Sequence, residues 1–200
     1  MRGFLAVAAM AANLFLAACY VSDKPFIAPA EADKPWPATA TYVSYDLKDN
    51  VWTPGKRGTV SFKAGVYTML DDGSDIPDYE TYKSIGGGLY VVQTYISPSD
   101  VAVSKMDVST DEGKQAMDII KGMAGQYFYW LVRIAGGTSY GFEIGCEEGD
   151  AKYLRAGLLA RIDQDNHKCY PKDFAALVRI LRDKQTGAKQ DSKTVITATP

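Results

Sequence analysis

The sequence predicts an α+β domain built on an antiparallel β-sheet, with two or three helices packed on it. Three observations support this fold class. Segments with alternating apolar and polar residues recur along the middle of the chain, a Gly-Gly pair separates two of them, and helical periodicity is confined to a few segments. The pattern also fits a sheet that curls into a partial barrel, and it does not decide between a closed barrel and an open sheet.

Length and composition fit one water-soluble domain. The chain has 200 residues, of which 46% are apolar and 23% are charged, as in an ordinary globular protein with one core. The formal charge of -2 provides no overall positive field, so the composition argues against a nucleic-acid partner. Histidine occurs once, at His167, which restricts metal and hydrolytic chemistry that depends on imidazole.

The first eighteen residues have the pattern of a secretory signal peptide. Met1 to Gly3 is a short positive start, and the run from Phe4 to Ala18 is apolar except for Asn13. This run is shorter than the ~20 residues that a membrane-spanning helix needs. We therefore interpret residues 1–18 as an export signal.

The apolar run ends in Leu16-Ala17-Ala18-Cys19. These four residues resemble the lipobox of bacterial lipoprotein precursors, and the resemblance covers only them and the signal before them. It implies cleavage before Cys19, diacylglyceryl attachment to the Cys19 sulfur, and acylation of the new amino terminus with a fatty acid such as palmitate. Two or three acyl chains hold a protein stably at a bilayer. The alternative is ordinary signal cleavage that leaves Cys19 as a free thiol.

The resemblance also implies a location. In lipoproteins similar to those of enteric bacteria, an Asp after the lipidated Cys favours retention in the inner membrane, and this chain has Tyr20 there. The expected place is therefore the cell envelope, on the outer membrane and facing the periplasm. The membrane, reached through the lipid on Cys19, is the first predicted partner.

The regions that flank the domain are expected to be extended. Residues 19–40 contain the anchor and four prolines without apolar periodicity, so they are predicted to form a tether. Residues 185–200, "QTGAKQDSKTVITATP" from Gln185 onward, offer few core residues and are predicted to be a disordered tail. The folded domain would then span residues 41–184.

At least five strands are predicted inside this domain. Alternation places Phe128, Trp130 and Val132 on one face of the segment 126–134, and a hairpin at Gly136-Gly137 joins it to the next strand. The segment 88–96 is apolar on both faces, which is typical of a central strand. The expected strands cover residues 41–47, 59–66, 88–96, 126–134 and 138–146.

Two helices are predicted, and a third has a competing interpretation. Ser109 and Glu112 form a capping-box pattern for a helix to about Lys121. Asp173 precedes a second helix with apolar residues at helical spacing. Residues 150–155 fit a short helix, although the alternation from 154 to 162 fits a strand equally well.

Two cysteines remain once Cys19 is assigned to lipid. An even pair in an oxidising compartment predicts a disulfide between Cys146 and Cys169. It would close a loop of about 24 residues and contribute about 3 kcal/mol in the chain-entropy model. The alternative is a pair of free thiols.

Two polar clusters are candidate metal sites. Asp163, Asp165 and His167 would share one face of an extended chain, but the same residues are common in turns. The stretch from Asp71 to Glu80 holds five acids without the spacing of a calcium loop, so we interpret it as a solvated turn. No cofactor, catalytic residue or metal site is assigned.

The sequence favours a lipid-anchored envelope protein that acts by binding or scaffolding rather than by catalysis. Its ligand or partner, whether an envelope protein, a glycan or a lipid, is left open, and the aromatic run at residues 127–130 suits a glycan or an apolar molecule. One alternative is a carrier with an apolar ligand inside the curled sheet, which an interior cavity lined by Phe, Trp and Val would favour. The other is a periplasmic hydrolase that uses Asp163, Asp165 and His167.

Overall fold

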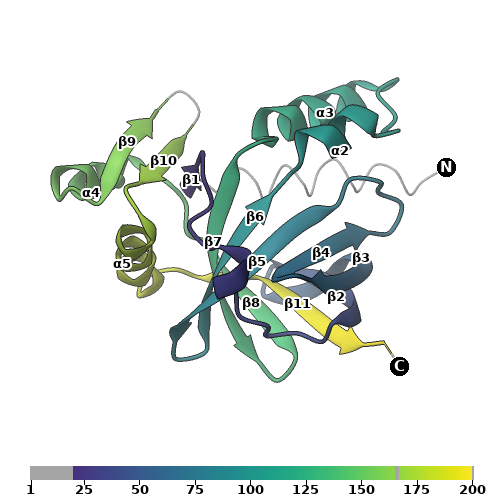
Figure 1. Cartoon of the computed structure of the whole chain (residues 1–200), viewed down its shortest axis with the longest axis horizontal. Helices are drawn as coiled ribbons and strands as arrows, with labels where there is room; N and C mark the ends of the chain where they lie inside the picture. Colours follow the sequence, from purple (N-terminus) through teal and green to yellow (C-terminus); the bar gives the residue numbers. More distant parts are fainter. Residues whose placement is uncertain (1–19, 165–166, 200) are drawn as a thin grey trace.

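The computed structural model describes residues 20–164 and 167–199. Eight antiparallel strands form a closed barrel, and helices and three further strands pack around it (Figure 1). The predicted signal peptide and Cys19 lie outside the described residues. The antiparallel sheet with packed helices is confirmed, but the barrel is closed rather than partial.

The barrel strands follow one another along the chain with two insertions, one between the fifth and sixth strands and a larger one before the last. They are β2 (Thr39–Lys48), β3 (Val51–Lys63), β4 (Val66–Asp71), β5 (Asp78–Gly86), β6 (Leu89–Tyr95), β7 (Tyr127–Ala135), β8 (Thr138–Phe142) and β11 (Gln190–Ala198). Each pairs with its neighbour, β6 pairs with β7, and β11 pairs with both β8 and β2. Every barrel strand therefore has a partner on each side, which removes free sheet edges.

Tight turns with positive φ angles connect the strands. Gly136 and Gly137, at φ 56° and 78°, join β7 to β8 as predicted. The predicted strand over residues 59–66 is wrong as one element, because Ala64 and Gly65 adopt φ 51° and 86° and turn the chain from β3 into β4. The alternation continues across this turn, so the pattern alone does not reveal it.

The predicted disordered tail is wrong, because residues 190–198 form β11. This strand pairs along β2 from Ser192 to Ala198 and along β8 from Gln190 to Val195. The side chain of Ile196 is buried among the interior residues of the barrel. Backbone pairing on both sides, with one apolar anchor, holds a segment that has little apolar character of its own.

The predicted tether is also wrong for its described part, because residues 20–40 pack on the barrel. Strand β1 (Tyr20–Ser22) is buried and pairs with β7 and with β10 (Lys168–Pro171). Further along, the backbone of Phe26 and Ile27 donates two hydrogen bonds, of 2.8 and 2.9 Å, to the Gln93 side chain on the outer wall. A proline-rich segment can thus be fixed by side chains that satisfy its backbone.

The described part of the chain contains four α-helices outside the barrel, against two or three predicted. Helices α2 (Pro98–Val103) and α3 (Asp111–Met123) lie between β6 and β7, and α4 (Ala151–Arg155) and α5 (Phe174–Gln185) lie between β8 and β11. Asp173 caps α5 as predicted, whereas Thr110 rather than Ser109 caps α3. No helix in the described part of the chain is long and apolar enough to cross a membrane.

The region between β8 and β11 forms a second core against the outer wall of the barrel. Besides α4 and α5 it contains β9 (Leu159–Asp163) and β10, so residues 150–163 supply both the helix and the strand that the sequence allowed. Buried residues of α5, including Leu177 and Ile180, belong to the same apolar cluster as Val91 and Leu131 of the wall. A disulfide joins Cys146 to Cys169 and ties β10 to the end of this wall. Two short 3-10 helices, Pro29–Glu31 and Glu148–Asp150, complete the fold.

Candidate functional site

The interior of the barrel contains a cavity of about 200 Å³. Seven of the eight barrel strands contribute to its lining, which combines aromatic, aliphatic and charged side chains. The apolar part includes Met69, Trp130, Val132, Phe142 and Ile196. A concave, largely apolar space with a few convergent polar groups is the usual form of a small-molecule site.

Three aromatic side chains, one of which also lines the cavity, pack together in the core of the barrel. Tyr67 is fully buried, and its hydroxyl donates to the Trp36 carbonyl at 2.7 Å and accepts from the Trp36 amide at 2.9 Å. Tyr82 packs edge-on against both rings, at centroid distances of 5.5 Å to Tyr67 and 6.3 Å to Trp36. Trp36 comes from the segment expected to be a tether, so that segment contributes a buried side chain to the core of the barrel.

The lining carries a strong excess of acidic groups. Among the described residues that line the cavity, one side chain is basic, Lys56, and five carry carboxyl groups: Asp46, Asp71, Asp78, Glu80 and Asp191. Lys56 lies 2.6 Å from Asp71, which also accepts a hydrogen bond from Tyr42. The lysine charge is therefore directly matched by one carboxylate, and four others face the same space.

Strand β5 presents acidic residues toward the interior in steps of two. Asp78 is half-buried, whereas Glu80 is 7% exposed and Tyr82 is 5% exposed. Because side chains alternate along a strand, all three point into the barrel and lie progressively deeper in it. The Tyr82 hydroxyl donates a hydrogen bond to Glu80.

Burial raises the pKa values of these two carboxyl groups. Burial raises the pKa of Glu80 from 4.5 to about 7; the hydrogen bond from Tyr82 opposes the rise and the nearby charge of Asp78 adds to it. Burial likewise raises the pKa of Asp78 from 3.8 to about 6, against the opposing charge of Lys56 and with that of Asp71. Acids with such shifted pKa values inside a cavity are typical of functional sites.

Replacing Glu80 by Gln is expected to stabilise the protein at alkaline pH. The pKa of Glu80 is higher in the folded state, so between about pH 4.5 and pH 7 the folded protein keeps a proton that the unfolded chain has lost. The free energy of unfolding of the natural protein therefore falls as pH rises through this range. A pKa shift of this size corresponds to about 3 kcal/mol. The free energy of unfolding of Glu80→Gln, relative to that of the natural protein, should therefore increase by about that amount from pH 4 to pH 8.

Urea unfolding at a series of pH values measures this difference. Glu31→Gln is the matched control, because Glu31 is exposed on the surface and its replacement should not change the pH profile. Parallel profiles for the natural protein and Glu80→Gln would show that Glu80 ionises in the folded state as it does in the unfolded chain.

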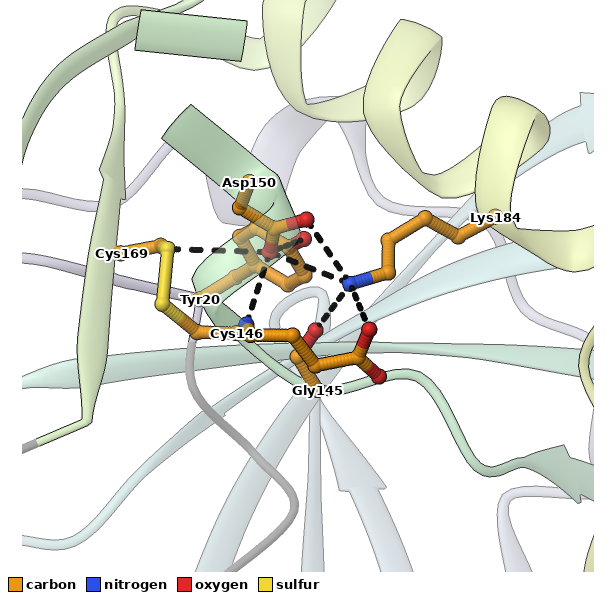
Figure 2. Close-up of a disulfide and its surroundings, with 7 residues drawn as sticks. Tyr20, Gly145, Cys146, Asp150, Cys169 and Lys184 are labelled. Carbon is orange, nitrogen blue, oxygen red and sulfur yellow. Dashed lines mark hydrogen bonds and ion pairs between the residues drawn. A yellow bond between two sulfur atoms is a disulfide. The ribbon is translucent and has the colours of Figure 1, made fainter. Parts of the chain in front are cut away.

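A second polar cluster lies outside the barrel, beside the disulfide (Figure 2). Asp150 accepts from the Tyr20 hydroxyl at 2.8 Å and from the Glu147 amide at 3.1 Å, and its two oxygens lie 3.0 and 3.1 Å from the Lys184 ammonium. Asp150 and the two cysteines, Cys146 and Cys169, have ligand atoms close enough for a metal. The sulfurs are bonded to each other and Asp150 is paired with Lys184, so this cluster is structural.

The predicted metal set of Asp163, Asp165 and His167 is not built as an extended strand. Asp163 ends β9 and pairs with Lys168 of β10, so the chain turns between them. His167 lies in this turn with φ 51° and is exposed, while Asp165 lies outside the described residues. The interpretation of this stretch as a turn is correct. Its described residues, Asp163 and His167, do not lie on one face of an extended strand, as the metal site would require.

The interpretation of the stretch from Asp71 to Glu80 as a solvated turn is partly wrong. Residues 72–77 do connect β4 to β5, but Asp71, Asp78 and Glu80 point into the cavity. The signal in the sequence is the two-residue spacing of Asp78, Glu80 and Tyr82, which places two acids and an aromatic ring on one strand face.

Comparison of the chain with protein-family models, with curated proteins and with solved structures finds no match in any of the three. The interpretation of the cavity therefore depends on its own geometry and chemistry.

Proposed function

We propose that the protein is a lipid-anchored envelope protein that binds a small organic molecule inside its barrel, as a carrier or receptor of that molecule. The observation that carries this proposal is the cavity of about 200 Å³, whose lining includes Trp130, Val132 and Phe142. An interior lined by such residues favours a protein that binds a ligand inside the barrel over a scaffold that acts through its outer surface. An enclosed apolar cavity of about 150 Å³ is enough to bind benzene, so the occupant is a molecule of one ring with a short substituent.

The location part of the proposal rests on the lipobox resemblance and gains support from the disulfide. A bond between Cys146 and Cys169 fits an exported protein, because such bonds persist in oxidising compartments. Tyr20, the residue after Cys19, is fully buried between the barrel wall and α5. A lipid on Cys19 would therefore hold the barrel close to the membrane surface rather than at the end of a long tether.

Metabolic labelling with a fatty acid tests the anchor. The full-length protein should incorporate the label, and Cys19→Ser should not. A natural protein that stays unlabelled and is released as a soluble product would overturn the anchor without bearing on the cavity.

Titration with a small aromatic probe tests the cavity. We expect 2-phenylethanol or 2-phenylethylamine to change the tryptophan fluorescence of the protein saturably, through Trp130 in the cavity wall, with one molecule bound per chain. Ser139→Phe should abolish binding, because Ser139 lines the cavity and is 9% exposed, so a phenyl ring there fills the space. Ser61→Phe is the matched control on the exposed face of β3 and should bind normally. Absence of saturable binding for both probes, or equal binding by Ser139→Phe, would overturn the proposed function.

A further inference from the structure

The cavity has more buried negative charge than its own cation can match. Lys56 is the one basic side chain among its described lining residues, and it pairs with Asp71 at 2.6 Å. Asp78 makes no side-chain hydrogen bond or ion pair within the described chain, and Glu80 receives its hydrogen bonds from neutral groups, such as the Tyr82 hydroxyl. Buried carboxylates without a cation are costly, so each of these groups either keeps a proton or meets a positive group that enters the cavity.

The geometry of β5 suits a single ammonium group. Asp78 and Glu80 stand two residues apart on one strand face, so their Cα atoms are about 7 Å apart and their side chains point into the same space. An ammonium carries three hydrogen-bond donors and no acceptor. An ionised carboxylate carries acceptors and no donor, so an ammonium matches this pair of acids. A hydroxyl or an amide would satisfy such acceptors without neutralising them.

The remaining lining suits the apolar body of the same ligand. The cavity wall includes the rings of Tyr42, Tyr82 and Trp130, and ring faces attract cations as well as apolar groups. An anion would meet the carboxylates inside the same cavity, and it would be repelled by them. The lining thus discriminates by charge as well as by size.

From this arrangement we infer that the ligand is a small organic cation, such as a primary amine on a short aromatic or aliphatic body, with its ammonium held by Glu80 and Asp78 and its body against the aromatic wall. The inference rests on the proposed function and adds the chemical class of the ligand. Glu80, the deeper of the two acids, is the residue that selects for charge.

Three probes of nearly the same shape test the inference on the full folded domain at pH 8. They are 2-phenylethylamine, 2-phenylethanol and phenylacetate, which carry a positive, a neutral and a negative group on the same ring. We expect the amine to bind at least about tenfold tighter than the alcohol, and the acid to bind most weakly. The dissociation constants are read from the tryptophan fluorescence of the protein and checked by calorimetry.

Variants separate recognition of charge from a general effect on the cavity. Glu80→Gln keeps the shape of the side chain. It should weaken binding of the amine about tenfold and leave binding of the alcohol unchanged. Asp78→Asn should act in the same direction and guards against a folding defect in the first variant. Glu31→Gln, on the exposed surface, should bind all three probes as the natural protein does.

Each outcome has a distinct meaning. Equal affinity for amine and alcohol, or tightest binding of phenylacetate, overturns the cationic class and leaves the proposed function standing. Binding of none of the three overturns the proposed function and this inference with it. An amine preference that both Glu80→Gln and Asp78→Asn retain in full overturns the assignment of the ammonium to β5.

Discussion

Removal of residues 189–200, which contain β11, is expected to abolish cooperative folding. Strand β11 pairs with β2 over seven residue pairs from Ser192 to Ala198 and also with β8, so its loss leaves two free edges and opens the barrel. It also removes Ile196 from the interior and exposes the cavity to water along its whole length. The truncated chain should retain some β-sheet signal by circular dichroism, but it should lose its near-ultraviolet signal and its sharp thermal transition.

The matched control removes only the last two residues, which follow β11. This shorter deletion should leave the melting temperature nearly unchanged, because the barrel keeps all its strands. A cooperative transition in the longer deletion, at a temperature close to that of the full chain, would mean that residues 190–198 behave as the disordered tail that their composition suggests.

Replacing Lys184 by Met is expected to destabilise the protein by about 3–5 kcal/mol. The Asp150 side chain is 3% exposed, and Lys184, at 13%, is its partner at 3.0 Å. Without the lysine, a buried carboxylate remains beside the Cys146–Cys169 disulfide and must be protonated or hydrated (Figure 2). Because Asp150 also binds the Tyr20 hydroxyl, the loss should loosen β1 and expose the start of the described chain.

Chemical denaturation measures the loss, and Lys152→Met provides the comparison. Lys152 pairs with Asp183 at the same 3.0 Å, but their side chains are 57% and 55% exposed. A surface pair of this kind contributes roughly 0–1 kcal/mol, so its removal should change the free energy of unfolding very little. Equal small effects of the two substitutions would show that Asp150 is adequately solvated or hydrogen-bonded without Lys184.

The strands that could be predicted from sequence are those with apolar interior faces. Strand β7 places Trp130 and Val132 inside the barrel, and its outer face bears Leu131 against α5, so apolar periodicity is plain. Helix α5 and the turn at Gly136-Gly137 follow from equally local rules. Closure of the barrel could not be predicted, because no local pattern encodes which distant strand pairs with β2.

The strands that sequence reasoning missed are those that face the polar part of the cavity. Strand β11 presents Ser192 and Thr194 to the interior, and β5 presents Asp78 and Glu80. The usual rule assigns apolar residues to the inside, so these segments look like a tail and a solvated turn. The polar interior thus made both the strands and the candidate site hard to recognise from the sequence.

A crystal structure of the protein grown with 2-phenylethylamine at pH 8 tests the central claim most directly. We expect electron density for one probe molecule inside the barrel, with its nitrogen about 3 Å from a carboxylate oxygen of Glu80 and its ring against Trp130. A cavity that holds only water at saturating probe, or one closed by Lys56 turned onto Glu80, would contradict a barrel built to bind a small cation.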